Sequence, residues 1–440
     1  MSAGRGSIWS TFRVSFQNVG PHMYRGNHRP HIRPCAIMGR SSTPLLVPFQ
    51  TDNMGVFTVL LVVLVALAAM FYQTVVSPLV KMGGFLHEIE PLNNRQCHSV
   101  PELEGCEKIV LFDEQSILYL ACSRISGRPH WLPNTEHLNV SGKPTDDYIA
   151  TYNLETGAIV KLRLEGFGSP RGISVHGMDV VPSSSDSKKL YVYLVNHRAP
   201  STGKADVVGA DSVMEIFETH LGSDVLHHVK TVEDPVIETP NDVVGSPDGK
   251  SFWFTNDHWG KTGFQRTLEL YFMLRRTTVG YCHVDEGCKF AAKNLPSANG
   301  IARSPINDTF YVASGFGGGL QILEKQTDNT LVLTDVVPIN LPLDNLAIDT
   351  NGALWIAFFP RGHQLHPRFK DTISDAASGA FRLTQNTGQG AFFGEKYRLD
   401  RMFEDSGRVV EGATSVTYSS RRKLLIMHGI SATRLALCKV

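Results

Sequence analysis

Six short stretches of the sequence each begin at a residue whose side chain could bind a cation or accept a proton. The starting positions are Glu107, His176, Asn241, Asn299, Asn345 and, less distinctly, residues near 414. Carboxylate and amide oxygens are the ligands that Ca²⁺ prefers, and a neutral imidazole can accept a proton near neutral pH. These residues could therefore build a calcium site beside a general base, provided that the fold brings them together.

Each stretch has the pattern of a β-hairpin, which is clearest in residues 239–259 (TPNDVVGSPDGKSFWFTNDHW). A short apolar run follows Asp242, turn residues occupy positions 246–249, and an aromatic-rich run returns over residues 251–255. Pro and Gly favour such a turn because Pro fixes φ and Gly tolerates positive φ. The pattern predicts two antiparallel strands in each stretch.

The six stretches recur at broadly similar distances along the chain. Successive starting positions lie 69, 65, 58, 46 and about 69 residues apart, which leaves room for a hairpin and two further strands each time. This spacing predicts an all-β fold, a six-bladed β-propeller over residues 97–440. The first strand of each blade lines the central channel of a propeller, so the starting residues are expected to meet near its axis.

The charge balance argues against one class of partner. The 440 residues include 42 Lys and Arg and 42 Asp and Glu, and this balance predicts no nucleic-acid partner. The N-terminal segment differs, because it contains several Arg residues and no acidic residue before Asp52. Residues 1–53 are predicted to be disordered. A mitochondrial presequence is the alternative, and translation could instead begin at Met38 or Met54.

Residues 54–80 contain no charged side chain, and their apolar core is long enough to cross a bilayer as a helix. We predict a transmembrane signal anchor, with a buried core helix or a cleaved signal peptide as alternatives. The basic segment precedes this helix, which predicts a cytosolic N-terminus and a lumenal or extracellular propeller. A mitochondrial or a secreted protein is the alternative location. Residues 81–96 are interpreted as a linker, and the sequons at Asn139 and Asn307 predict glycosylation in the lumen.

Three segments of the propeller region depart from the hairpin pattern. Helical character is expected near residues 213–219 and 369–377. Residues 360–408 are long, polar and Gly-containing, and we interpret them as an irregular excursion on one face of the propeller.

The sequence contains seven cysteines, namely Cys35, Cys97, Cys106, Cys122, Cys282, Cys288 and Cys438. In a lumenal compartment disulfides can form. Cys97 opens the propeller region and Cys438 lies close to the chain end, so a bridge between them would fasten the first strand to the last. Cys282 and Cys288 flank a short turn and could pair locally. Free buried thiols are the alternative for every pair.

The oxygen-bearing residues are ordinary turn residues when each is taken singly. Together they predict one calcium site, with the ligands Glu107, Asn241, Asn299, Asp344 and Asn345. The cation would offset the repulsion between the two carboxylates, and with an open position it could polarise an ester or lactone carbonyl. His176 is the expected general base and His197, in the same hairpin, its partner; a structural histidine is the alternative.

Several motifs occur in an order that is informative as a set. They are the Glu107 strand start, HGM at 176–178, VNH at 195–197, PND at 240–242, TNDHW at 255–259, ANG at 298–300, LDN at 343–345 and the Cys97/Cys438 pair. Residues 92–440 thereby resemble the paraoxonase/arylesterase family of six-bladed, calcium-dependent lactonases. The resemblance implies that Glu107, Asn241, Asn299, Asp344 and Asn345 hold a catalytic calcium and that His176 and His197 form a dyad. It also implies a second, structural calcium at Asp242 and the backbone carbonyl of Met178.

The chain departs from the family pattern at Lys108, because the family usually has Glu-Asp where this sequence has Glu107-Lys108. An ammonium cannot ligate a cation and would repel one. We therefore predict that Lys108 pairs with Asp242 in the space of the second ion and that only one calcium binds. An alignment shifted by one residue, with Cys106-Glu107 at these positions, is the alternative.

The leading hypothesis is a membrane-anchored, calcium-dependent hydrolase of small lactones and aryl esters. Two alternatives share the propeller. One is a sugar-lactone hydrolase that uses Glu, Asn and Asp on one divalent metal. The other is a lumenal binding propeller without catalytic activity, in which calcium serves stability.

Overall fold

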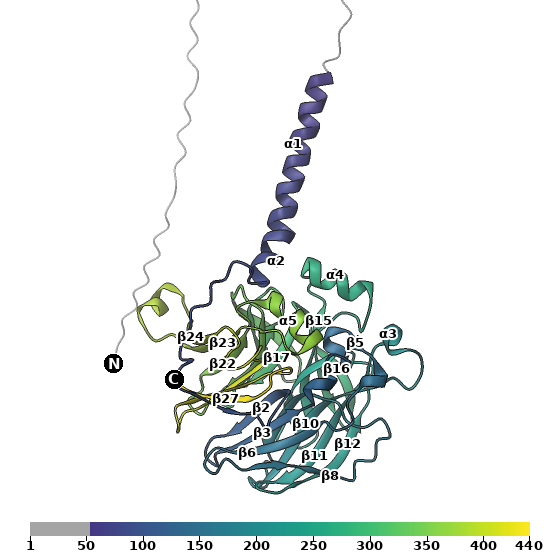
Figure 1. The fold of residues 1–440 in the computed structure, drawn as a ribbon, viewed down its shortest axis with the longest axis vertical. Coiled ribbons are helices and arrows are strands. Elements are labelled where there is room, and N and C mark those ends of the chain that lie inside the picture. The colour runs from purple at the N-terminus through teal and green to yellow at the C-terminus, as the bar shows by residue number, and fades with distance from the viewer. Residues whose placement is uncertain (1–52) are drawn as a thin grey trace, which may run out of the picture. The chain divides into compact units, whose positions relative to one another are not determined.

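The computed structural model describes residues 53–440 (Figure 1). The predictions made for residues 1–52, including Cys35 and the alternative start at Met38, lie outside the described residues. The chain forms two compact units, which divide between Leu60 and Leu61.

The second part is an all-β six-bladed propeller, as the sequence predicted. Blade 1 consists of β2 (Cys106–Phe112), β3 (Ile117–Cys122), β6 (Tyr148–Asn153) and β7 (Ile159–Lys161). Blade 2 consists of β9 (Val175–Pro182), β10 (Lys189–Arg198), β11 (Asp211–His220), β12 (Val225–Val232) and the parallel β8 (Arg163–Glu165). Blade 3 consists of β13 (Pro240–Gly245), β14 (Ser251–Asn256), β15 (Thr277–His283) and β16 (Gly287–Leu295).

The remaining three blades follow the same plan. Blade 4 consists of β17 (Ala298–Arg303), β18 (Thr309–Ser314), β19 (Leu320–Lys325) and β20 (Leu331–Val337). Blade 5 consists of β21 (Leu343–Ile348), β22 (Leu354–Phe358), β23 (Ser378–Gln385) and β24 (Tyr397–Asp405). Blade 6 consists of β25 (Ser415–Ser419), β26 (Leu424–His428), β27 (Leu435–Lys439) and the N-terminal β1 (Cys97–Val100).

Connections between strands hold the remaining short elements. They are the ladder β4 (Trp131–Leu132) with β5 (His137–Leu138), and the helices α3 (Ala205–Val208), α4 (Phe264–Phe272) and α5 (Leu365–Asp371). Tight 3₁₀ turns occur at Ile125–Gly127, Pro133–Thr135, Val140–Gly142, Gly362–Gln364 and Gln389–Phe393.

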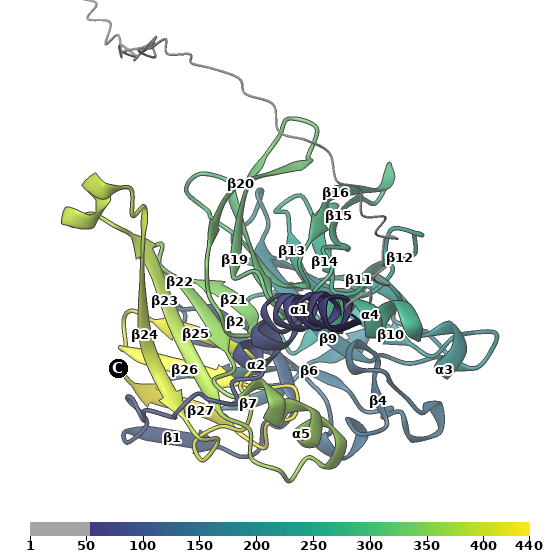
Figure 2. The same cartoon turned by 90° about the horizontal axis from the view of Figure 1, so that it is seen from above.

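The six first strands (β2, β9, β13, β17, β21 and β25) contact one another in a closed ring around the axis (Figure 2). Six clusters of buried apolar side chains fill the six interfaces between neighbouring blades. The second strands lie within the blades, which is why β14 and β22 are buried along their whole length. Apolar burial therefore fixes the blades, and polar side chains remain for the ring at the centre.

The ring is closed by the two ends of the propeller. β1 pairs with β27 in an antiparallel register that places Cys97 opposite Cys438, and a disulfide joins them across 341 positions. The predicted terminal bridge is therefore present. Closing so long a loop removes entropy from the unfolded chain, on the order of 5 kcal/mol in the loop-closure model.

Two further disulfides lie within blades. Cys282 and Cys288 pair as predicted, across the β15–β16 turn. The Cys106–Cys122 bridge was not predicted. It joins directly opposed residues of the β2–β3 hairpin and lies next to Glu107.

Two expectations about the outer strands are wrong. Residues 360–408 are not an irregular excursion, because they supply β23 and β24, the outer half of blade 5. Residues 213–219 form part of strand β11 and no helix. In both cases pairing with a neighbouring strand decides the structure, which local composition does not reveal. The helix expected near residues 369–377 exists as α5, although it begins earlier, at Leu365, and ends at Asp371.

The predicted membrane segment is helical. It consists of α1 (Asn53–Phe71), a π-helical turn (Tyr72–Val76) and α2 (Ser77–Met82). Within the described residues, the span Gly55–Met82 is the one helix long and apolar enough to cross a membrane. It is a candidate N-terminal membrane helix.

We expect the terminal disulfide to contribute more to stability than the local one. Replacing Cys97 and Cys438 by Ser should lower the free energy of unfolding by roughly 4–5 kcal/mol, whereas the same change at Cys282 and Cys288 should cost about half as much, because that loop is short. Thermal unfolding of the two double variants is the measurement. Equal losses would contradict ring closure as the source of the stabilisation.

Candidate metal centre and active site

Five of the first strands are irregular at the residues that were singled out in the sequence, including β9, where the shift in pairing spans His176. The pairing register shifts between Cys106 and Lys108, between Pro240 and Val243, between Ala298 and Ile301, and between Leu343 and Leu346. Such bulges interrupt the alternation of a strand and re-aim side chains. The residues inside these shifts are Glu107, Asn241, Asp242, Asn299, Asp344 and Asn345.

Two glycines permit the close approach of neighbouring first strands. A Cβ atom at Gly177 would lie 2.2 Å from the backbone oxygen of Asn241, and one at Gly300 would lie 2.5 Å from that of Asp344. The glycines of the HGM and ANG motifs therefore bring the predicted ligands together, because only a residue without a side chain fits there.

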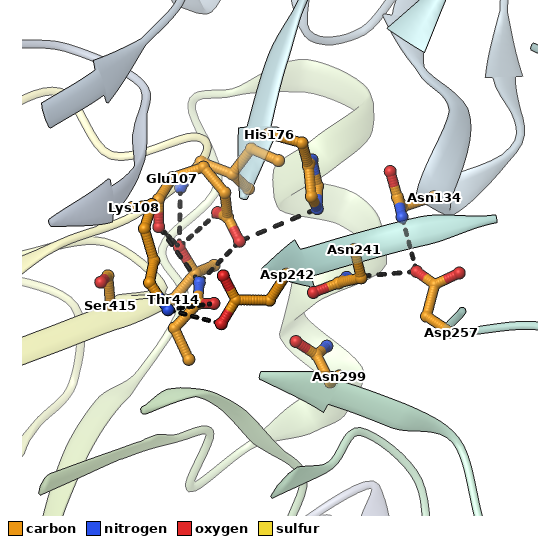
Figure 3. A network of polar contacts seen from close by, with 12 residues as sticks. Glu107, Lys108, Asn134, His176, Asn241, Asp242, Asp257, Asn299, Thr414 and Ser415 are labelled. Atoms are coloured by element: carbon orange, nitrogen blue, oxygen red, sulfur yellow. Dashed lines mark hydrogen bonds and ion pairs between the residues drawn. The ribbon is translucent and has the colours of Figure 1, made fainter. Parts of the chain in front are cut away.

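Glu107 is the residue on which the site converges (Figure 3). Its Oε1 accepts a hydrogen bond from Asn345 Nδ2 at 2.8 Å, and its Oε2 accepts one from Thr414 Oγ1 at 2.6 Å. His176 Nε2 lies 3.9 Å from Oε1. Residues from blades 1, 2 and 5 and from the start of blade 6 thus meet at one buried carboxylate.

Three oxygens of the predicted catalytic calcium site have no hydrogen-bond partner within the described residues. They are Asn241 Oδ1, Asn299 Oδ1 and Asp344 Oδ1, and all three are buried. Asn241 and Asn299 extend into the same space beside Asp242 (Figure 3). An unsatisfied buried oxygen costs about 1–3 kcal/mol, so three of them in one ring are an arrangement that a bound cation would stabilise.

The electrostatics of the buried carboxylates Glu107 and Asp344 also favour a bound cation. Burial raises the pKa of Glu107 to about 7, although hydrogen bonds from Thr414 and Asn345 oppose the shift. Burial also raises the pKa of Asp344 well above its usual range, and the charge of Glu107 adds to this effect. A divalent cation between the two carboxylates would favour their ionised forms. The donors therefore fit one hard cation such as Ca²⁺.

Carboxylates and imidazoles alone do not define this centre. Among the described residues, no group of three or more His, Cys, Asp or Glu side chains is placed to hold a metal. The predicted set differs from such a group because three of its five members are Asn, whose amide oxygens are ligands for Ca²⁺ but not for softer metals.

The two predicted histidines are neighbours. The rings of His176 and His197 lie 5.1 Å apart in an edge-to-face arrangement. His197 Nδ1 is 2.8 Å from Ser212 Oγ, whereas His176 Nδ1 and His197 Nε2 have no hydrogen-bond partner among residues 53–440. Burial lowers the pKa of His176 well below its usual range and that of His197 to about 4. Both rings are therefore neutral at physiological pH, and protonation of either ring needs a nearby negative charge to stabilise it.

A pocket reaches His197 from outside the axis. Its lining includes His197, Asp257 and Arg266. A second, wider pocket adjoins it and shares Ser212, Glu238 and Lys261 with it. The pocket beside His197 has a volume of about 10 Å³, which is room for about one water molecule.

Three residues of the site were not predicted. Asp257 Oδ2 accepts hydrogen bonds from Asn134 Nδ2 at 2.6 Å and from Asn241 Nδ2 at 3.2 Å (Figure 3). Because Asp257 binds the nitrogen of the Asn241 amide, the amide oxygen is turned to the free side. Thr414 orients Glu107 in the same way. The sequence carried a signal for Asp257, which follows the return strand of the clearest hairpin, but none for Asn134.

Asp242, which the family resemblance implies as a ligand of a second calcium, forms an ion pair with Lys108 instead. Lys108 Nζ donates to Asp242 Oδ2 at 2.5 Å and lies 3.4 Å from the Leu346 carbonyl oxygen. Met178 is buried in β9. The predicted pairing of Lys108 with Asp242 is therefore present, and its ammonium leaves a second divalent cation no fit at this place.

The fold and these donors define a class: a six-bladed β-propeller with a buried, oxygen-rich centre on its axis. The chain belongs to the arylesterase family, a family of carboxylic-ester hydrolases, because the family profile (Arylesterase) matches residues 126–440.

Individual relatives agree with this assignment. Serum paraoxonase/arylesterase 2 of Bos taurus is 26% identical over 341 residues, which cover 77% of this chain and 88% of that protein. Serum paraoxonase/lactonase 3 of Homo sapiens is 25% identical over 342 residues, with the same coverage. A solved structure of a gluconolactonase from Xanthomonas campestris aligns with 80% of this chain and 97% of its own, at 14% identity and a TM-score of 0.43.

We expect Asp257 to act on the metal centre through Asn241. Asp257→Ala should weaken calcium binding by about 10- to 100-fold, because the partners that orient metal ligands contribute to affinity on this scale. The calcium affinity of Asp257→Asn should lie between those of Asp257→Ala and the unchanged protein, since one acceptor oxygen remains. The measurement is calorimetric calcium titration of the full chain in detergent. Asp285→Ala is the control, because Asp285 is an exposed acid of the same blade. Equal affinity in all three variants would contradict the positioning role.

Proposed function

We propose that the chain is a calcium-dependent hydrolase of lactones and aryl esters, with its active site on the propeller axis. The observation that carries the proposal is the set of three buried oxygens, at Asn241, Asn299 and Asp344, that have no hydrogen-bond partner in the described part of the chain and lie beside the carboxylate of Glu107. Membership of the arylesterase family supports the reaction class.

Glu107, Asn241, Asn299 and Asp344 would hold the ion, together with Asn345. When bound, Ca²⁺ supplies polarisation of the ester or lactone carbonyl and charge stabilisation for the oxyanion. Asn345 Oδ1 lies 3.5 Å from Lys108 Nζ while its Nδ2 donates to Glu107, so Asn345 also orients the carboxylate.

His176 is the proposed general base. Its Nδ1 has no hydrogen-bond partner among the residues that the structure describes, so this nitrogen can take a proton from the attacking water. Glu107 Oε1, 3.9 Å from Nε2, stabilises the imidazolium that results. His197 lies beside this ring and lines the pocket, which suits a relay of the proton outward. Ser212 holds His197 by its other nitrogen.

The test is turnover of the full chain in detergent micelles on three substrates: an aryl acetate, an aliphatic lactone and a sugar lactone, each with and without a calcium chelator. We expect Asn241→Ala and Asp344→Ala to lower kcat/KM by roughly 100-fold or more, as loss of a group that stabilises the oxyanion does. Asn351→Ala is the control, because Asn351 is an exposed amide in the same blade as Asp344.

Each alternative predicts its own outcome. A preference for the sugar lactone would favour the sugar-lactone hydrolase. Melting that depends on calcium, without turnover of any substrate, would favour the non-catalytic propeller. Full turnover in Asn241→Ala would overturn the proposed mechanism.

We place the propeller on the lumenal or extracellular side of a membrane, anchored by the N-terminal helix. Three disulfides within the described residues support an oxidising compartment. The basic segment before the helix supports a cytosolic N-terminus.

Both predicted glycosylation sites lie at the surface. Asn139 and Asn307 are exposed residues of the propeller. We expect an endoglycosidase to increase the electrophoretic mobility of the membrane-expressed chain, and Asn139→Gln and Asn307→Gln each to remove part of that shift. Absence of any shift, with a propeller open to protease in sealed microsomes, would contradict this topology.

A further inference from the structure

The ammonium of Lys108 lies in an unusual place, buried near the axis among first strands of different blades. Lys108 belongs to β2, its partner Asp242 belongs to β13, and the carbonyl oxygen of Leu346 belongs to β21. Both side chains of the ion pair are almost completely excluded from solvent. The Lys108 ammonium therefore contacts oxygens from two other blades.

Asp242 extends the connection to a further blade. The Oδ2 atom that binds Lys108 also accepts a hydrogen bond from the backbone nitrogen of Ile301 in β17 at 3.0 Å. The other oxygen, Oδ1, is buried and has no hydrogen-bond partner within the described residues. Four of the six blades are thus held by one carboxylate and the cation beside it. An unpaired carboxylate at this depth would be strongly destabilising.

A lysine at this position can stand in for a metal and its ligand, in charge and in reach. An aspartate with a bound Ca²⁺ carries −1 and +2, a sum of +1, which is the charge of the ammonium. An aspartate side chain extended by a Ca–O bond of about 2.4 Å reaches nearly as far from the backbone as a lysine side chain does. The oxygens that surround Lys108 are the carboxylate, amide and carbonyl types that Ca²⁺ accepts.

We infer that Lys108 is a built-in structural cation, which ties the blades at the axis in place of a divalent ion. The fold consequently does not require calcium at this place, and any ion that the chain binds serves the neighbouring centre of the proposed function. The same geometry makes Lys108→Asp a switch: this one change turns the position of the ammonium into a divalent-cation site.

The first test counts bound calcium in the full chain, purified in detergent, by equilibrium dialysis and elemental analysis. We expect Lys108→Asp to bind one ion more than the unchanged protein. Lys250→Asp is the matched control, because Lys250 is an exposed lysine that also forms an ion pair, with Asp285, and it should add none. An equal ion count in Lys108→Asp and the unchanged protein would overturn the inference.

The second test measures thermal unfolding and does not depend on activity. Lys108→Met should lower Tm by on the order of 5–10 °C, because it leaves the Asp242 charge buried alone. The double variant Lys108→Met/Asp242→Asn should recover part of this loss, as expected for a coupled pair. Without calcium Lys108→Asp should melt below the unchanged protein, and calcium should raise its Tm more.

Contrary results are equally definite. A Lys108→Met variant as stable as the unchanged protein would overturn the structural role of the ammonium. So would a Lys108→Asp variant whose Tm responds to calcium no more than that of the unchanged protein.

The two proposals fail separately. If the unchanged protein binds no calcium and its turnover ignores the chelator, the proposed function fails, whereas one ion gained by Lys108→Asp would still support the built-in cation. If the unchanged protein binds two ions, Lys108 is not a replacement, and the proposed hydrolase stands.

Discussion

The burial of several negative charges on the propeller axis is the constraint on which the rest of the site depends. Glu107, Asp242 and Asp344 are all buried there, and each feels the charge of at least one of the others. Three anions at this depth require positive charge or protons. The chain supplies two buried positive charges itself: Lys108 pairs with Asp242, and the charge of Arg128 acts on Glu107. In the proposed site, Glu107 and Asp344 would also hold the calcium ion.

In this fold, the regular pairing of the first strands is interrupted at the centre of the propeller. Bulges release the first-strand side chains, and Gly177 and Gly300 let neighbouring strands approach closely. The apolar clusters between blades and the Cys97–Cys438 closure carry the stability that such irregular strands cannot provide. Stability and chemistry therefore occupy different radii of the propeller. The axis can hold polar, strained and partly unsatisfied groups because the interfaces around it are fully packed.

Local patterns predicted the features that depend on one hairpin at a time. The six first strands begin where apolar runs and turn residues place them, and the pairing of Cys282 with Cys288 follows from one turn. The Cys106–Cys122 bridge had the same kind of signal, since the two residues flank the turn of one hairpin and lie opposite each other. The outer strands of blade 5, β23 and β24, were not predicted, because they are defined by pairing with neighbouring strands and not by apolar alternation. The hydrogen bond of Asn134 to Asp257 spans 123 positions, and nothing local encodes it.

The distribution of charge also explains how the centre can exist without its ion. Glu107 and Asp344 have raised pKa values because they are buried, so protons can neutralise them when no metal is present, and metal binding then releases those protons. Asp242 differs, because its pKa is raised by burial but held down by the charge and hydrogen bond of Lys108, which keeps it paired. A covalently attached cation cannot dissociate or be chelated. Lys108 and Asp242 therefore form a pair that stays with the fold, whereas Glu107 and Asp344 would exchange protons for the ion of the proposed site.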